Sequence, residues 1–208
     1  PGQSITYVDA LYTAVSALCV TGLSIVDTAA VFNPFGQAIL AVLIQVGGLG
    51  VSTMGAGVLL MLGRKVGIRQ RNLIHDTMNL DSYSGVVRFL RTLFATTVFI
   101  EVIGAFLGYF VFRRDYEMME SIGLSIFHSI SSFNNAGLTI LTKERSMEMY
   151  AEDPFMLILT TALVFVGGLG FIVIRECWVN RFRWRKLSMH SRVSIFMAVF
   201  LLIGGAVL

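Results

Sequence analysis

The stretch from Thr28 to Gly63 contains no Asp, Glu, Lys or Arg. A helix needs about 20 consecutive apolar residues to cross the hydrocarbon core of a bilayer, so we expect a membrane span near residues 36–62. The composition agrees, because the chain is 55% hydrophobic and only 14% charged, whereas soluble domains carry about 25% charged residues. A soluble globular protein is therefore excluded.

Three further segments are apolar enough to span a membrane. Residues 89–112 are interrupted only by Glu101, residues 154–174 carry no charge, and residues 193–208 begin another span. The chain opens with Pro-Gly-Gln-Ser and shows no cleavable signal pattern. We therefore expect an all-α, multi-pass membrane protein, of which this chain is an internal fragment.

Two other apolar segments, 10–26 and 121–142, contain Ser, Thr, Asn and Gly where a span should be most apolar. Non-helical backbone at membrane depth is tolerated only where it is buried in protein or lines a watery cavity. These segments are therefore predicted to be re-entrant loops, and a pair of them indicates a permeation site.

The Lys and Arg residues predict the orientation, because short cytoplasmic loops carry the excess. Residues 63–91 and 175–192 each hold six Lys or Arg, against two acids and one acid respectively, whereas residues 113–153 hold four against seven acids. Loops 63–88 and 179–192 are thus predicted to be cytoplasmic and the mouths of the re-entrant loops extracellular. The basic stretch 181–186, with interleaved Phe182 and Trp184, suits either inner-leaflet lipid or a cytosolic partner.

Nucleic acid is not an expected partner. The net charge is only +3, and the charges lie in short clusters between apolar runs rather than on one basic surface. Cys19 and Cys177 form neither a disulfide framework nor the spacing of a zinc site.

The chain contains an internal repeat, which can define a whole membrane architecture. Val-Gly-Gly-Leu-Gly occurs at 46–50 and again at 166–170. Upstream, segment 14–25 aligns with segment 129–140, which superposes Ser16 on Ser131 and Gly22 on Gly137. Each unit is therefore predicted to contain a pore helix, a glycine-centred loop, an external linker and a spanning helix.

This repeat predicts five regions. They are 1–62, the pore loop and second span of a first repeat; 63–88, a cytoplasmic loop; 89–178, a complete second repeat; 179–192, a cytoplasmic loop; and 193–208, the start of a third repeat.

The motifs resemble a known family. Val20-Thr-Gly-Leu-Ser24 and Asn134-Asn-Ala-Gly-Leu-Thr139, each followed by Val-Gly-Gly-Leu-Gly, look like the Trk/Ktr/HKT cation transporters, most of all the KtrB-type potassium-translocating subunit. The resemblance implies four span–loop–span units around one pore, potassium uptake with sodium as a coupling ion, a homodimer, and a cytosolic ring of regulatory subunits that alone binds nucleotide. It also implies that Gly in the loops goes with potassium preference.

The chemistry of such a filter follows from the backbone. Rings of main-chain carbonyls replace the water around a potassium ion with dipoles rather than full charges, so the ion can also leave. Gly is needed where that backbone turns, because it reaches positive φ without steric cost. We expect six carbonyls to coordinate the ion, with Cys19 and Asn134 at the inner edge: those of Val20, Thr21, Gly22, Asn135, Ala136 and Gly137. The alternative is that the two glycines merely permit tight turns.

The pore helices point their C-terminal ends, which carry a partial negative charge, toward the middle of the membrane. Asp9 and Glu120 lie near the opposite ends of these helices. They are expected to cap the helices, or else to concentrate cations at the mouth.

The glycine runs and Glu101 have structural alternatives to direct ion binding. Small residues four positions apart let helix backbones approach closely. The glycines of the two runs are therefore predicted to lie inside each span and to pack behind the filter: Gly47, Gly48, Gly50, Gly167, Gly168 and Gly170. The alternative is that they form a gating hinge. Glu101 near mid-span is a functional candidate. We expect it to face protein and bond to Ser129 or Ser131, with direct ion binding as the alternative.

Two other functions are compatible with parts of the sequence. His128 adjoins Ser129, which suggests an intramembrane hydrolase, but adjacent helical residues point about 100° apart and the first repeat has Thr13 at the histidine position. A structural or auxiliary membrane subunit would leave the paired polar loops unexplained. The sequence therefore predicts a transporter rather than an enzyme, in which both glycine loops meet on one axis.

Overall fold

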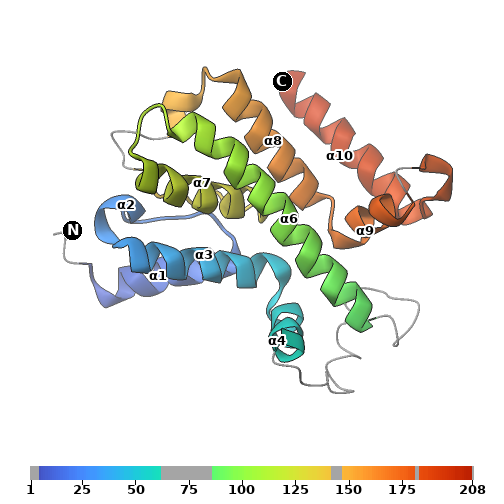
Figure 1. Cartoon of the computed structure of the whole chain (residues 1–208), viewed down its shortest axis with the longest axis horizontal. Coiled ribbons are helices and arrows are strands. Elements are labelled where there is room, and N and C mark those ends of the chain that lie inside the picture. Colours follow the sequence, from blue (N-terminus) through green and yellow to red (C-terminus); the bar gives the residue numbers. More distant parts are fainter. Residues whose placement is uncertain (1–4, 62–85, 142–146, 181–182, 208) are drawn as a thin grey trace.

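The computed structural model describes residues 5–61, 86–141, 147–180 and 183–207. Within these ranges the regular elements are all helices, joined by turns and extended loops, with no strand among them (Figure 1). The predicted all-α fold is therefore confirmed.

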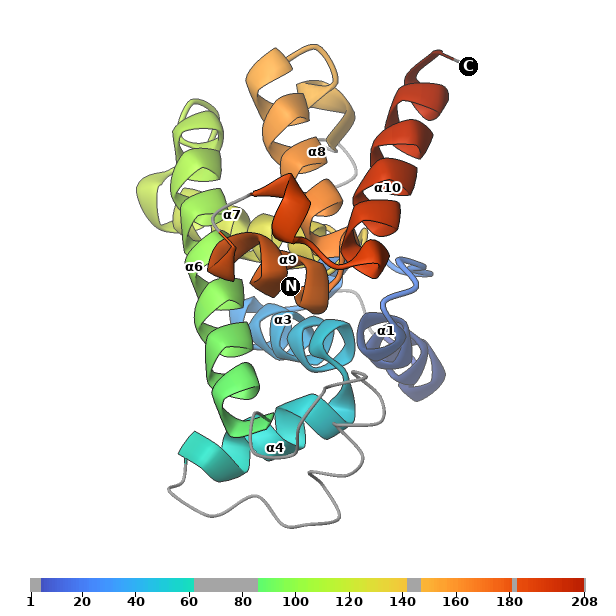
Figure 2. The ribbon, with the colours of Figure 1, turned by 90° about the vertical axis from the view of Figure 1, so that its right-hand side faces the viewer.

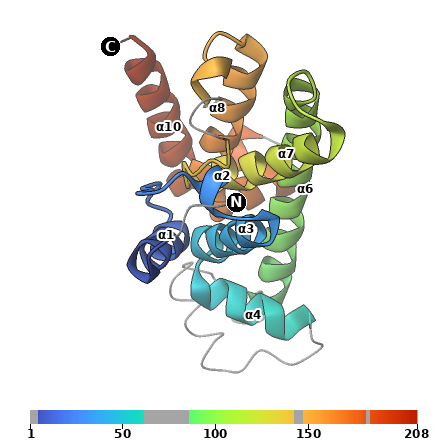
Figure 3. The ribbon, with the colours of Figure 1, turned by 90° about the vertical axis from the view of Figure 1, so that its left-hand side faces the viewer.

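Within residues 5–61, the first unit forms α1 (Tyr7–Cys19), α2 (Thr28–Val31), α3 (Pro34–Leu49) and α4 (Val51–Met61). Thr6 caps α1 by accepting a hydrogen bond from the Asp9 amide, and Asn33 caps α3 just before Pro34. α1 and α3 lie side by side (Figures 2 and 3). Between these helices and α7, buried apolar residues form one core: Ala17, Leu40, Ile44, Phe127, Ala136 and Leu138.

The second unit holds α6 (Val86–Phe112), α7 (Met118–Phe133), the short helix η3 (Met147–Tyr150), α8 (Pro154–Gly168) and α9 (Phe171–Val179). Asp153 caps α8 through the amides of Phe155 and Met156. α7 packs against both α6 and α8. The core of this unit is formed by Val111, Phe112, Leu124, Leu141, Tyr150, Met156, Leu159 and Leu163.

The last part of the chain forms η4 (Trp184–Lys186) and α10 (Met189–Val207). α10 contacts α9, where Val173, Cys177 and Leu187 form a small buried cluster. The rest of α10 carries exposed apolar side chains, including Phe196, Phe200 and Ile203.

The helix over Val87–Phe112 is long and apolar enough to cross a membrane, and α8 with α9 would make a second span if that bent pair is counted as one. Only 22% of the most apolar window of the first helix is buried within the protein. Most of this apolar surface therefore faces away from the rest of the chain.

The structure corrects the prediction of continuous spans over 36–62 and 154–174. α3 ends at Leu49 and α4 starts at Val51, while α8 and α9 are separated at residues 169–170 and their axes differ by 99°. The reason is local, because Gly50 has φ 84° and Gly170 has φ 82°, a backbone conformation that glycine alone adopts readily. The glycine runs therefore end helices instead of lying well inside them.

The predicted cytoplasmic loop 63–88 falls almost wholly outside the described residues, as do parts of the external linker and of loop 179–192. The five predicted regions and their topology remain predictions.

Candidate functional site

Two loops leave the C-terminal ends of α1 and α7 with the same backbone pattern. Val20 and Gly22 have positive φ (55° and 74°), and so do Asn135 and Gly137 (58° and 68°). These pairs are 115 residues apart, as the sequence repeat predicts. A left-handed conformation is costly for a β-branched residue such as Val20, so the surrounding contacts must impose it.

Hydrogen bonds to the preceding helix impose it in both loops. The Thr21 amide donates to the Ser16 carbonyl at 3.0 Å, and the Ala136 amide donates to the Ser131 carbonyl at 2.8 Å. One residue earlier, the Val20 amide donates to Ala17 and the Asn135 amide to Ser132. The amides of residues 20–21 and 135–136 thus point back at their helices.

Serine side chains fix the loops further. The hydroxyls of Ser16 and Thr21 are 2.9 Å apart, and the Ser131 hydroxyl donates to the Leu138 carbonyl at 2.6 Å. Ser16 and Ser131, which the repeat superposes, therefore both hold a loop through their side chains.

The two loops meet backbone to backbone. A Cβ built on Gly22 would lie 2.7 Å from the Ala136 carbonyl oxygen, and a Cβ on Gly137 would lie 3.8 Å from the Cα of Gly22. The Thr28 hydroxyl also bonds the Thr139 carbonyl across the two units. The paired glycines therefore permit a close approach of the loops as well as a turn.

The glycine runs pack behind these loops. A Cβ on Gly47 would lie 1.9 Å from the Leu18 carbonyl oxygen, and one on Gly167 would lie 1.8 Å from the Phe133 carbonyl oxygen. Gly48 faces the Asn134 side chain, where a Cβ would lie 2.0 Å from Oδ1. Gly168 has more room, and Gly50 and Gly170 lie at the helix breaks.

The loop carbonyls are free to act as ligands. No hydrogen bond among the described residues ends on the carbonyls of residues 20–22 or 135–137. In the same ranges, no three His, Cys, Asp or Glu side chains gather into a group that could hold a metal ion.

Glu101 faces this site and is only 9% exposed. The Ser129 hydroxyl does bond Glu101, but it donates to the main-chain carbonyl at 2.7 Å. The carboxylate instead accepts from Asn134 Nδ2 at 3.2 Å and from Gln45. The expected bond from Ser129 or Ser131 to the carboxyl group is thus corrected, because Ser131 is already bonded to Leu138.

The N-caps of the two helices are not the expected acids: Thr6 caps α1, and the N-cap of α7 is Glu117, which makes no side-chain cap hydrogen bond. α1 and α7 end where the loops begin, which directs the negative ends of their dipoles at the loop carbonyls. Asp9 and Glu120 lie in the first turns of the two helices. Cys19 is the last residue of α1 and is exposed, whereas Asn134, at the matching position of the second unit, is buried.

Residues 1–203 match the TrkH family, described as a cation transport protein. That match covers nearly the whole chain. The chain belongs to the TrkH family.

Three curated relatives agree with this family. The proteins of Bacillus subtilis and Vibrio alginolyticus that are both called Ktr system potassium uptake protein B are 35% and 37% identical to this chain. The potassium/sodium uptake protein NtpJ of Enterococcus hirae is 36% identical. The aligned share is 93% of this chain for the first and 100% for the other two, but only 43%, 45% and 45% of these relatives. The chain therefore spans less than half the length of the relatives it matches.

Membership of the TrkH family also decides between a transporter and an enzyme, because its members are transport proteins. The rival Ser-His pair does not form: Ser129 donates to Glu101, and the ring of His128 lies 3.1 Å from the Thr160 hydroxyl. His128 also lies 3.4 Å from the Ser132 hydroxyl, and its ring meets the Phe112 ring edge to face. The resemblance to a cation transporter is thus confirmed.

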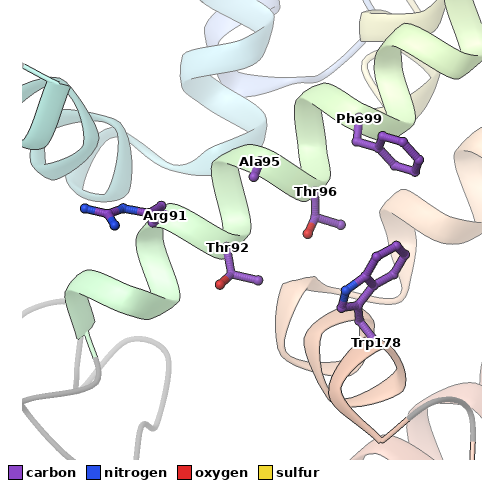
Figure 4. Close-up of a pocket in the computed structure, with 6 residues that line it drawn as sticks. All are labelled: Arg91, Thr92, Ala95, Thr96, Phe99 and Trp178. Atoms are coloured by element: carbon purple, nitrogen blue, oxygen red, sulfur yellow. The ribbon is translucent and has the colours of Figure 1, made fainter.

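A separate pocket of about 460 Å³ lies between α6 and α9, away from the two loops (Figure 4). Phe99 and Trp178 approach each other edge to face across it, with ring centroids 6.2 Å apart. None of the predicted filter residues lines it; its lining consists of Arg91, Thr92, Ala95, Thr96, Phe99 and Trp178.

Sequence reasoning missed Gln45 of this TrkH-family chain. Its side chain reaches both Asn134 and Glu101 from α3 of the first unit. A signal was present, because Gln45 is the one strongly polar side chain between Ala38 and Gly50.

Proposed function

We propose that this chain forms part of a pore through which potassium ions enter the cell down their electrochemical gradient. The carbonyls of residues 20–22 and 135–137 would coordinate the ion and supply two of four expected filter segments. The observation that carries the proposal is the matched pair of loops. Their amides at residues 20–21 and 135–136 donate to the preceding helix, while the carbonyls of residues 20–22 and 135–137 accept no hydrogen bond among the described residues. Backbone dipoles of this kind hold a cation without trapping it.

The relatives' names favour potassium as the ion, because two are called potassium uptake proteins, whereas NtpJ is called a potassium/sodium uptake protein. We propose sodium as a coupling ion on the family resemblance.

Partners and placement extend the proposal. We propose a homodimer in the cell membrane, with loops 63–88 and 179–192 in the cytoplasm and the mouths of the glycine loops outside. The name "Ktr system" implies a partner subunit for those relatives, and we propose a cytosolic ring of nucleotide-binding subunits here. Purification of the full-length transporter with and without such a ring would test this assembly by mass.

The proposal is tested by potassium uptake in cells that lack their own uptake systems. The full-length transporter is compared with its Gly137→Ser variant, and Gly123→Ser in α7 serves as a control because nothing lies within 4 Å of a Cβ at Gly123. We expect Gly137→Ser to lose uptake or potassium-over-sodium preference while Gly123→Ser keeps both. Unchanged uptake and preference in Gly137→Ser, at normal membrane expression, would overturn the filter assignment.

A further inference from the structure

The side-chain amide of Asn134 is surrounded by acceptors. Its Nδ2 lies 3.0 Å from Gln45 Oε1, 3.2 Å from Glu101 Oε1 and 2.9 Å from the Ile130 carbonyl oxygen. An amide nitrogen has two hydrogens to donate, so three acceptors more than satisfy it. These acceptors also fix which way the amide faces.

The oxygen atom of the same side-chain amide fits in its place only because residue 48 is glycine. Asn134 Oδ1 occupies the place where a Cβ of Gly48 would be, 2.0 Å away. Asn134 is therefore held between α3 of the first unit, which supplies Gln45 and Gly48, and α6 of the second unit, which supplies Glu101. The cluster joins the two units directly at the start of the second loop.

The arrangement is not demanded by the repeat. The residue that matches Asn134 in the first unit is Cys19, which is exposed, and the residue that matches Gln45 in the second unit is Phe165, which cannot hydrogen-bond in this way. Burying a carboxylate inside a span is costly. A cluster that appears once and carries that cost needs a reason beyond the architecture.

We propose that Glu101 and Gln45 are positioning residues: they lock the Asn134 side chain and thereby set the inner end of the second loop for discrimination of potassium from sodium. Asn134 immediately precedes Asn135, whose φ of 58° begins the turn of the loop. The Glu101 carboxyl oxygen accepts a hydrogen bond from Asn134 Nδ2 at 3.2 Å, so Glu101 limits the movement of this turn through an acceptor oxygen. The inference rests on the proposed function, because it assigns these residues a role in the same filter.

The test uses the full-length transporter in cells that lack potassium uptake, with the KM and maximal rate for potassium and the inhibition by sodium measured for each variant. Glu101→Gln keeps an acceptor oxygen without the charge, whereas Glu101→Leu removes both. We expect Glu101→Gln to stay within about twofold of wild type and Glu101→Leu to lose about tenfold in potassium-over-sodium preference, which corresponds to ~1.4 kcal/mol. Gln45→Leu should lower the preference in the same direction, and the double variant should lose less than the product of the two single losses.

Thr97→Val is the matched control. Thr97 lies one turn before Glu101 on α6, is buried, and its hydroxyl has no hydrogen-bond partner within the part of the chain that the structure describes. The valine variant should therefore keep wild-type preference and expression.

The outcomes separate the hypotheses. A loss in Glu101→Gln as large as in Glu101→Leu would mean that the carboxylate charge itself acts on the ion, which overturns the positioning role. Wild-type preference in Gln45→Leu would also overturn it, and this variant remains informative if Glu101→Leu fails to reach the membrane. Gly137→Ser is measured alongside: if it alters preference while the Gln45 and Glu101 variants do not, the filter stands and the positioning role fails.

Discussion

Gly47 packs directly against the main-chain carbonyl of Leu18, so closely that a Cβ on Gly47 would lie 1.9 Å from that oxygen. Gly167 makes the matching contact with Phe133 at 1.8 Å. In each unit, a helix that carries the glycine run thus lies behind the last turn of the helix that leads into the glycine-centred loop. This contact sets where the loop begins.

Gly47→Ala and Gly167→Ala should therefore each destabilise the protein, because the added methyl group meets backbone rather than a flexible side chain. Overpacking typically costs about 1–3 kcal/mol, and the thermal unfolding temperature of the purified transporter and its potassium uptake should both fall. Gly123→Ala, where a Cβ meets nothing within 4 Å, should lower neither, because alanine has the higher helix propensity. Wild-type stability and uptake in Gly47→Ala would contradict this account.

The two loop glycines should differ in their tolerance of alanine. Both have positive φ, which costs an L-residue roughly 1–2 kcal/mol, but only at Gly22 would the new Cβ lie 2.7 Å from a backbone oxygen, that of Ala136. Gly22→Ala should therefore reduce uptake more than Gly137→Ala does. Side-by-side uptake measurements at matched expression test this order, and equal losses would argue against the close approach of the loops.

Ser131→Ala should weaken the second loop. The buried Ser131 hydroxyl bonds the Leu138 carbonyl at 2.6 Å, and an acceptor left unsatisfied by such a change costs about 1–3 kcal/mol. Ser125→Ala is the control, because Ser125, also on α7 and buried, only bonds the carbonyl of Ile122 within its own helix. We expect potassium-over-sodium preference to fall in the first variant and to stay at its wild-type value in the second.

Gly170→Ala should destabilise the bend between α8 and α9. Gly170 has φ 82° and ψ 148° and nothing within 4 Å of a Cβ, so the whole penalty of about 1–3 kcal/mol is conformational. Gly168→Ala, in the same run but helical and with its nearest neighbour at 3.8 Å, should be tolerated. Thermal unfolding of the two purified variants distinguishes them; a Gly170→Ala protein as stable as wild type would show that the bend does not need glycine.

Asp153 should stabilise the protein more through its helix cap than through the ion pair it forms. Its carboxylate pairs with Arg114 Nη1 at 2.8 Å, but the Arg114 side chain is 63% exposed, and exposed pairs contribute at most about 1 kcal/mol. The same carboxylate caps α8 through the amides of Phe155 and Met156, which is worth about 0.5–2 kcal/mol. We expect Asp153→Ala to be less stable than Arg114→Ala in thermal unfolding, and Asp153→Asn to be about as stable as wild type. If Arg114→Ala lost as much stability as Asp153→Ala, the ion pair rather than the helix cap would be the main contribution of Asp153.

Much of this protein could be predicted from local sequence. The apolar runs predict the helices, the repeat predicts a matching pair of glycine-centred loops, and Gly22 and Gly137 both adopt the positive φ expected of glycine at a turn. The left-handed conformation of Val20 could not be predicted in this way, because its β-branched side chain disfavours that conformation and only the hydrogen bonds back to α1 impose it. Asn adopts this conformation more readily than most residues, but that tendency alone does not place Asn135 in a turn.

The sequence by itself determined the helical membrane class, the family and the position of both loops, because these depend on apolar runs and on short motifs that repeat along the chain. The tertiary structure alone decided where the helices break and which groups meet. The apolar pattern predicts helices that continue through Gly50 and Gly170, but the helices end there. The Glu101 carboxyl group bonds Asn134 and Gln45 rather than a serine hydroxyl. Those partners lie 33 and 56 residues from Glu101 along the chain, and hydropathy or local propensity carries no information about contacts over such separations, which arise only when the two units pack together.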